Sequence, residues 1–196
     1  MESWLAVAVS RIESLRRARD DFERSLFCVA ADQWGWGTAC GSWTVADLVS
    51  HVIGATHMHI ALLDGACGRD AVPLASVSFG ADEAVAEFLD AADALETRFA
   101  APDVLTRIDL HHPAGDVSGD DLLGYAMVEW VLHGWDLARA VGADDSIDPD
   151  LALVLYDEMR PATGRLSALG AFAPAIPTPP GAGVAERLLR LLGRCP

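Results

Sequence analysis

The chain has 196 residues, of which 52% are hydrophobic, and a formal net charge of −15. This length and this hydrophobic content predict one globular domain over residues 1–196. The excess of acidic residues excludes electrostatic attraction to nucleic acid or to anionic membrane surfaces. The sequence contains no lysine, which also excludes chemistry through a lysine Schiff base.

Four cysteines are scattered along the chain without a Cys-x-x-Cys pair, which favours a reducing compartment. The N-terminal segment carries Glu2 and no basic region, so it is predicted to be a helix and not a signal peptide. No apolar stretch approaches the roughly 20 residues that a membrane span requires. We therefore expect a soluble, cytoplasmic protein without a membrane partner.

The first half of the chain predicts helices separated by an aromatic loop. Apolar residues recur at three- and four-residue steps over about 5–30, the period of one helical face. The segment 33–43 is rich in tryptophan and glycine, which predicts an ordered loop. Thr44 and Asp47 resemble a capping box and predict the start of a second helix, over about 45–63.

A third helix is expected over about 82–100, where the apolar residues again follow the helical period. The segment 103–117 is interpreted as a crossover with a short extended piece, followed by residues 111–113 in a turn. Ser118 has the position of a helix cap, which predicts a long fourth helix over 119–141.

The last third of the chain predicts an additional helical segment. Asp148 and Pro149 form an N-cap and N1 pair that starts a fifth helix, expected to end near residue 169. A proline-rich stretch over about 170–185 then leads to a short terminal helix. Together these elements predict an all-α fold.

The second and fourth helices carry polar side chains on otherwise apolar faces. Glu129 and His133 are four residues apart, so their side chains lie on the same side of a helix. His51 lies in an apolar stripe of the second helix. Buried charges are costly unless they are paired or metal-bound, so we predict that these three residues bind one divalent metal ion. Zinc is the first candidate, and the same ligands accept nickel, manganese or iron. The alternative is two core histidines hydrogen-bonded to each other, to Glu129 or to backbone.

Three further residues are candidates for catalysis. His59 follows His51 by about 80° around the helix and could act as a general acid or base, with packing or a surface position as the alternative. Asp136 could accept a hydrogen bond from the ring of His133, or instead pair with Arg139 on the helix surface. Arg139 could bind a carboxylate of the substrate or of a thiol cofactor.

Aromatic residues near the predicted ligands are candidates for a cofactor pocket. Trp43 precedes the His51 helix and could form a wall of this pocket or simply pack in the core. Tyr125 lies one turn before Glu129 and could reach the same cavity. Cys40 has no basic neighbour in the sequence, so packing is favoured over a nucleophilic role. His111 and His112 are expected in a solvent-exposed loop and not as metal ligands.

Three sequence blocks resemble the actinobacterial branch of the DinB-like metal-binding superfamily, whose best-understood relatives are mycothiol-dependent enzymes. The blocks are Cys40–His51, Glu129–Ala140 and Glu186–Pro196, in the order that the family shows. The resemblance implies a DinB-like four-helix bundle with a metal, usually zinc, on His51, Glu129 and His133. It also implies mycothiol as co-substrate, bound to the metal as thiolate.

The leading functional hypothesis is thus a metal-dependent enzyme for transfer of a thiol to, or isomerisation of, a small electrophilic metabolite. Maleylpyruvate isomerisation itself is not expected, because the isomerase-type relatives carry an additional C-terminal domain without a counterpart here. The alternatives are a metal-activated-water hydrolase or lyase on the same ligands, and a non-catalytic metal- or ligand-binding protein. The high apolar content also permits a homodimer.

Overall fold

The computed structural model describes residues 2–71 and 78–196. The chain forms two compact units, Met1–Asp145 and Ser146–Pro196. The single domain expected over residues 1–196 stays a prediction. No helix in the described ranges combines the length and the apolar character that a membrane span requires.

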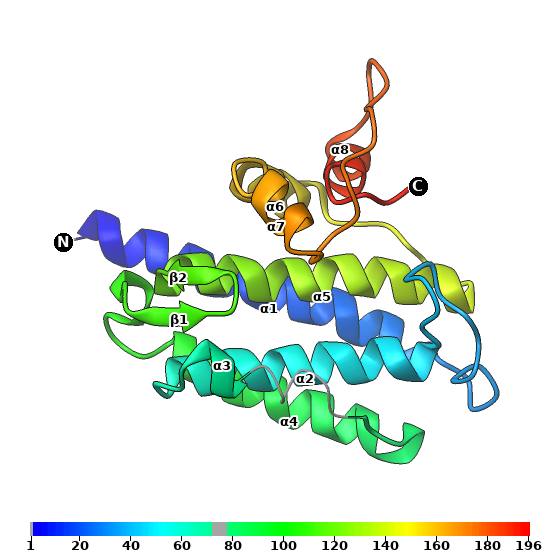
Figure 1. The fold of residues 1–196 in the computed structure, drawn as a ribbon, viewed down its shortest axis with the longest axis horizontal. Coiled ribbons are helices and arrows are strands. Elements are labelled where there is room, and N and C mark those ends of the chain that lie inside the picture. Colours follow the sequence, from blue (N-terminus) through cyan, green and yellow to red (C-terminus); the bar gives the residue numbers. More distant parts are fainter. Residues whose placement is uncertain (1, 72–77) are drawn as a thin grey trace. The chain divides into compact units, whose positions relative to one another are not determined.

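Four long helices form the first unit and pack along their lengths (Figure 1). α5 packs against α1 and α2, and α2 also packs against α4. Large side chains such as Phe22, Phe88 and Trp130 are fully enclosed between them. The predicted all-α, DinB-like four-helix bundle is confirmed. The helices are α1 (Glu2–Phe27), α2 (Val45–Leu63), α4 (Ala81–Phe99) and α5 (Gly119–Val141).

Capping boxes start the two helices that carry the candidate ligands, as the sequence predicted. The Thr44 hydroxyl accepts from the Asp47 backbone N–H at 3.2 Å, and the Asp47 carboxylate accepts from the Thr44 N–H at 2.9 Å. Ser118 and Asp121 repeat this arrangement at the start of α5, with both distances 3.0 Å. Each box satisfies N–H groups that the first helical turn leaves unpaired. The starts of α2 and α5 are therefore defined by local sequence.

The turn of α5 that contains His133 packs closely on α1. A Cβ atom added at Gly134 would lie 3.3 Å from the Cα of Phe22, a tighter contact than side chains usually make. The absence of a side chain at Gly134 therefore lets the two backbones approach each other. Because Gly134 directly follows His133, this contact fixes the ligand-bearing turn of α5.

The connections in the first unit correct three details of the sequence-based prediction. A short helix α3 (Gly68–Ala71) follows α2, where the glycines were expected only to end a helix. The crossover contains a 3₁₀ turn (Val104–Thr106) and an antiparallel hairpin of β1 (Leu110–His112) and β2 (Gly115–Val117). His111 and His112 therefore lie in a strand and not in a turn. Cross-strand pairing, which local sequence reveals poorly, decides this difference.

The second unit contains three helices, of which α6 and α8 pack together. The single fifth helix predicted up to residue 169 is instead two helices, because Pro161 cannot donate a helical backbone hydrogen bond. The proline-rich segment carries no helix over 171–183, and the terminal helix is present as predicted. The three helices are α6 (Pro149–Met159), α7 (Thr163–Ala168) and α8 (Val184–Leu191).

Candidate metal centre

His51, Glu129 and His133 converge between α2 and α5. Glu129 Oε2 lies 3.3 Å from His51 Nε2 and also 3.3 Å from His133 Nε2. The two imidazole rings stand nearly perpendicular, with centroids 5.1 Å apart and an interplanar angle of 82°. One nitrogen from each ring and one carboxylate oxygen all lie within 4.8 Å of one another. Packing of α2 against α5 thus brings together the three residues that the sequence predicted as ligands.

This donor set fits a divalent cation. Two imidazoles and a carboxylate form a ligand combination that zinc accepts, with the ion about 2.0–2.2 Å from each ligand atom and one coordination position left open. The His133 side chain is only 8% exposed, whereas His51 and Glu129 are 29% and 23% exposed. The cluster is therefore accessible from the side of His51 and Glu129, where a small molecule can approach.

The electrostatics of the cluster favour positive charge beside Glu129. Burial alone would raise the pKa of the Glu129 carboxyl, but hydrogen bonds from His133 and His51 hold this pKa well below its ordinary value. Burial opposes the charge of His133, yet its hydrogen bonds, above all with Asp136, raise the pKa of this imidazole well above its ordinary value. A divalent cation supplies the same compensation when it displaces protons from its ligands.

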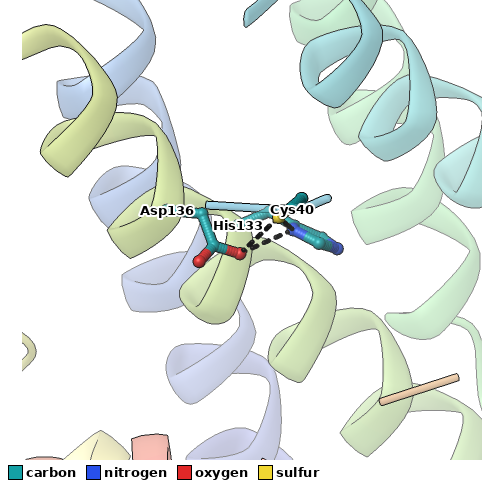
Figure 2. Close-up of side chains that lie close together, drawn as sticks. All are labelled: Cys40, His133 and Asp136. Carbon is teal, nitrogen blue, oxygen red and sulfur yellow. Dashed lines mark hydrogen bonds and ion pairs between the residues drawn. The ribbon is translucent and has the colours of Figure 1, made fainter. Parts of the chain in front are cut away.

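The opposite side of the His133 ring is held by a buried carboxylate. Asp136 is fully buried, and its Oδ2 lies 3.1 Å from His133 Nδ1. The Cys40 thiol donates to the same oxygen at 3.1 Å, so thiol and imidazole converge on one carboxylate atom (Figure 2). An acceptor at Nδ1 places the ring proton there and leaves Nε2 free to bind a metal. Of the two roles expected for Asp136, the geometry favours the partner of the ligand imidazole.

Arg139 is not brought to the cluster. Its side chain is 45% exposed, pairs with Asp145 at 3.1 Å and lies over the Trp135 ring at 4.9 Å. Arg139 follows Asp136 by only three residues, but the turn of α5 directs its guanidinium to the surface. The expected role of Arg139 in binding a carboxylate of substrate or cofactor therefore has no support in the geometry.

Of the two expected pocket aromatics, Trp43 lies against the ligand histidines and Tyr125 lies against His112. The Trp43 ring centroid is 4.7 Å from that of His51 and 6.0 Å from that of His133, so it lies against the ring of His51 and near that of His133. Tyr125 is buried one turn before Glu129, with its ring 5.2 Å from that of His112. His59 is also buried, and its ring lies 6.3 Å from that of His112.

Cys40 and His112 are the residues whose surroundings the sequence did not reveal. Cys40 was favoured as a packing residue, because no basic residue adjoins it in the sequence. Its neighbours His133 and Asp136 lie more than ninety positions away and meet it through the loop before α2. The Thr38 hydroxyl accepts from the Cys40 N–H at 3.1 Å and so holds this part of the loop.

The model of the family described as "Mycothiol maleylpyruvate isomerase N-terminal domain" matches residues 15–138 of the chain. The chain belongs to this family. The matched range contains all three candidate ligands and both capping boxes. The resemblance to DinB-like, mycothiol-related proteins is thereby confirmed.

Two family relatives come from Mycobacterium tuberculosis, the Uncharacterized proteins MT0763 and Rv0738. Each is 33% identical to this chain over 181 residues, which cover 91% of this chain and 94% of the relative. The similarity therefore extends well beyond the family domain.

Two solved structures share the fold. The mycothiol-dependent maleylpyruvate isomerase gives a TM-score of 0.68 at 16% identity, with 96% of this chain and 90% of that chain covered. A histidine-to-alanine mutant of such an isomerase also gives 0.68, at 15% identity, with 83% and 72% covered. At the level of fold, most of the second unit thus has a counterpart in the structure of the mycothiol-dependent maleylpyruvate isomerase that is not the mutant. This coverage corrects the expectation that the C-terminal part of the isomerases has no counterpart here.

Proposed function

We propose that this protein is a metal-dependent enzyme of the mycothiol-dependent type, which transfers a thiol to, or isomerises, a small electrophilic metabolite. The observation that carries the proposal is the convergence of His51 Nε2, Glu129 Oε2 and His133 Nε2 on one point that is accessible from one side. Membership of the mycothiol maleylpyruvate isomerase N-terminal domain family supports mycothiol as the thiol.

His51, Glu129 and His133 would hold the metal, with zinc as the first candidate. A divalent ion held there would lower the pKa of a bound thiol and so favour the thiolate form at neutral pH. Asp136 acts as a positioning residue, because its hydrogen bond fixes the tautomer and the ring orientation of His133. Because Asp136 is completely buried, water does not compete for this hydrogen bond.

Trp43 and the partial exposure of two ligands define how a substrate approaches. The indole lies against the ring of His51 and near that of His133, which gives the cluster an apolar neighbour on that side. Access remains on the side where His51 and Glu129 are exposed. We propose that the thiol enters there and that Trp43 forms an apolar wall of its binding site.

Metal content and thiol binding together test the proposal. The purified protein is compared with the His51→Ala and His133→Ala variants by elemental analysis. His57→Ala is the matched control, because His57 lies on the same helix but is not part of the cluster. Its Nε2 pairs instead with Glu87 Oε1, at 2.8 Å. We expect about one metal ion per chain in the wild type and the control, and its loss in both ligand variants.

The thiol step is then followed by absorption of the cobalt-substituted protein during titration with mercaptoethanol. Appearance of a thiolate-to-cobalt band supports the thiol-dependent enzyme. Retention of metal in both ligand variants would overturn the assignment of the site. A metal-loaded protein that never gives the band would instead favour a metal-activated-water hydrolase or lyase on the same ligands.

A further inference from the structure

His59 is a buried imidazole that makes no hydrogen bond within the described part of the chain. It is only 2% exposed, and neither of its ring nitrogens bonds to any residue in the described ranges. Burial of a polar group without a partner is costly, and native proteins rarely tolerate it without a reason. Every fully buried side-chain nitrogen or oxygen in the described part of the chain does have a partner. The nitrogens of His59 must therefore keep some accessible surface, where a ligand can meet them.

His59 lies on the same side of α2 as the metal-ligand cluster. It follows His51 by eight residues, which corresponds to about 12 Å along the helix axis and a rotation of about 80°. Burial is the main cause that lowers the pKa of His59, and the charges of Glu129 and His51 also act on this pKa, so the cluster lies within electrostatic range of the ring.

The ring of His112 lies next to His59, and the ring of Tyr125 lies next to that of His112. The ring centroid of His112 on β1 lies 6.3 Å from that of His59. The ring centroid of Tyr125 on α5 lies 5.2 Å from that of His112. His112 Nδ1 accepts from the Ala114 backbone N–H at 3.0 Å, so the proton of the neutral ring is on Nε2. Helix α2, helix α5 and the hairpin thus each supply one ring with a polar edge.

The chemistry of these rings selects an uncharged ligand group. Burial lowers the pKa of His59 to about 4, so its ring is neutral at physiological pH. A neutral imidazole offers one donor and one acceptor. A carboxylate could only accept and would lie near the carboxylate of Glu129, and an ammonium group could only donate. A hydroxyl both donates and accepts, and it costs less to bury than an ion.

We propose that His59, next to the ring of His112, binds a hydroxyl group of the ligand whose reactive end occupies the cluster of His51, Glu129 and His133. This inference rests on the proposed function for the position of the reactive end. It adds a second contact point, along α2, which selects ligands by the distance between sulfur and hydroxyl.

A series of thiols of graded length measures this distance. The cobalt-substituted full chain is titrated with ω-hydroxyalkanethiols from mercaptoethanol to mercaptohexanol. Each is compared with the alkanethiol that carries a methyl group in place of the hydroxyl. We expect one or two chain lengths to bind about three- to tenfold more tightly than their methyl counterparts, the effect of one hydrogen bond.

Matched variants assign the preference to His59. His59→Phe keeps a ring of similar size and removes both nitrogens, so the preference for the hydroxyl should disappear while metal content is unchanged. The control is His57→Phe, because His57 lies on the same helix but pairs with Glu87. This control should retain the preference. Equal binding of the two series by the wild type, or a preference that persists in His59→Phe, would overturn the proposal.

Nitrogen NMR of the wild-type histidine side chains separates this inference from the proposed function and does not depend on any variant. Addition of butanediol, which lacks sulfur, should shift the His59 signals even if no thiol ever reaches the cobalt. In that case the thiol-dependent function fails and the hydroxyl site stands. Unmoved His59 signals with both butanediol and the hydroxyalkanethiols would overturn the hydroxyl site alone.

Discussion

The two ends of the packed helices α2 and α5 hold their histidines in opposite ways. At the end near the loop before α2, His51 and His133 share Glu129, and the other nitrogen of His133 is held by Asp136. At the end near the hairpin, His59 has no hydrogen bond within the described residues.

This difference separates a site that is preorganised for a cation from one that an uncharged group can complete. At the loop end, carboxylates lie on both sides of the His133 ring and stabilise positive charge. At the hairpin end, burial keeps the His59 ring neutral. Two histidine-containing regions of one helix pair are therefore suited to different chemical groups.

The largest expected effect comes from removal of Glu129, which joins the two ligand histidines. Glu129→Ala should weaken metal binding by more than about a hundredfold, because loss of a direct ligand should exceed the effect of an outer partner. Competition with a chelator measures the affinity. Glu87→Ala is the control, since this carboxylate pairs with His57 outside the cluster. Full metal retention in Glu129→Ala would place the metal elsewhere.

The pH dependence of stability tests the hairpin end. His59 faces His51 on its own helix, Glu129 on α5 and His112 on β1, and its folded pKa is about 4. An unfolded histidine titrates near 6.5, so the unfolded chain binds more protons between these two values. The contribution of His59 should therefore lower the free energy of unfolding as the pH falls from about 6.5 to 4, by on the order of 3 kcal/mol, with no effect above this window.

Urea unfolding of the wild type and His59→Phe across this window measures the contribution as the difference between two curves. His57→Phe, a substitution of the same kind on the same helix, should follow the wild type. If the curves of His59→Phe and the wild type run parallel between pH 6.5 and 4, His59 is not held neutral by burial.

A smaller effect is expected at Asp136, which orients a ligand without binding the metal. Asp136→Asn preserves the size of the side chain but removes its charge from His133 Nδ1. Metal affinity should fall by about 10- to 100-fold, the usual effect of such a partner. Asp145→Asn removes a surface carboxylate that pairs with Arg139 and should leave the affinity unchanged. Equal affinities in the two variants would argue against a positioning role for Asp136.

The smallest effect is expected at Cys40, which donates to Asp136 at 3.1 Å. Cys40→Ala should lower the free energy of unfolding by about 1 kcal/mol, because the buried carboxylate loses one donor. Cys40→Ser keeps a hydroxyl donor and should restore most of this loss. Chemical denaturation of the metal-free protein measures both variants. A serine variant no more stable than the alanine variant would show that the hydrogen bond contributes little.

Local sequence predicted the helices of the first unit because their signals are local. Hydrophobic periodicity and the caps at Thr44 and Ser118 involve residues within a few positions of one another. The hairpin was missed because its pairing of Leu110 with Val117 depends on its contacts and not on a strong strand pattern. The fifth helix was predicted too long because Pro161 was not treated as a break.

The candidate ligands could be selected from sequence for a similar reason. Spacing alone puts Glu129 and His133 on one side of α5, and an imidazole on an apolar stripe marks His51 as unusual. The same reasoning could not separate Arg139 from Asp136, which are three residues apart. The rotation of α5 against its neighbours directs one side chain to the surface and the other into the core.

The sequence by itself determined the helical fold, the starts of α2 and α5 and the side of α5 that carries two ligands. Only the tertiary structure decided which side chains face one another across elements: Cys40 with Asp136, Trp43 with His51, and His112 with His59. The physical reason is that helix formation follows from interactions within one or two turns. Contacts between residues far apart in the chain depend instead on how the helices, the loop and the hairpin pack around a shared core.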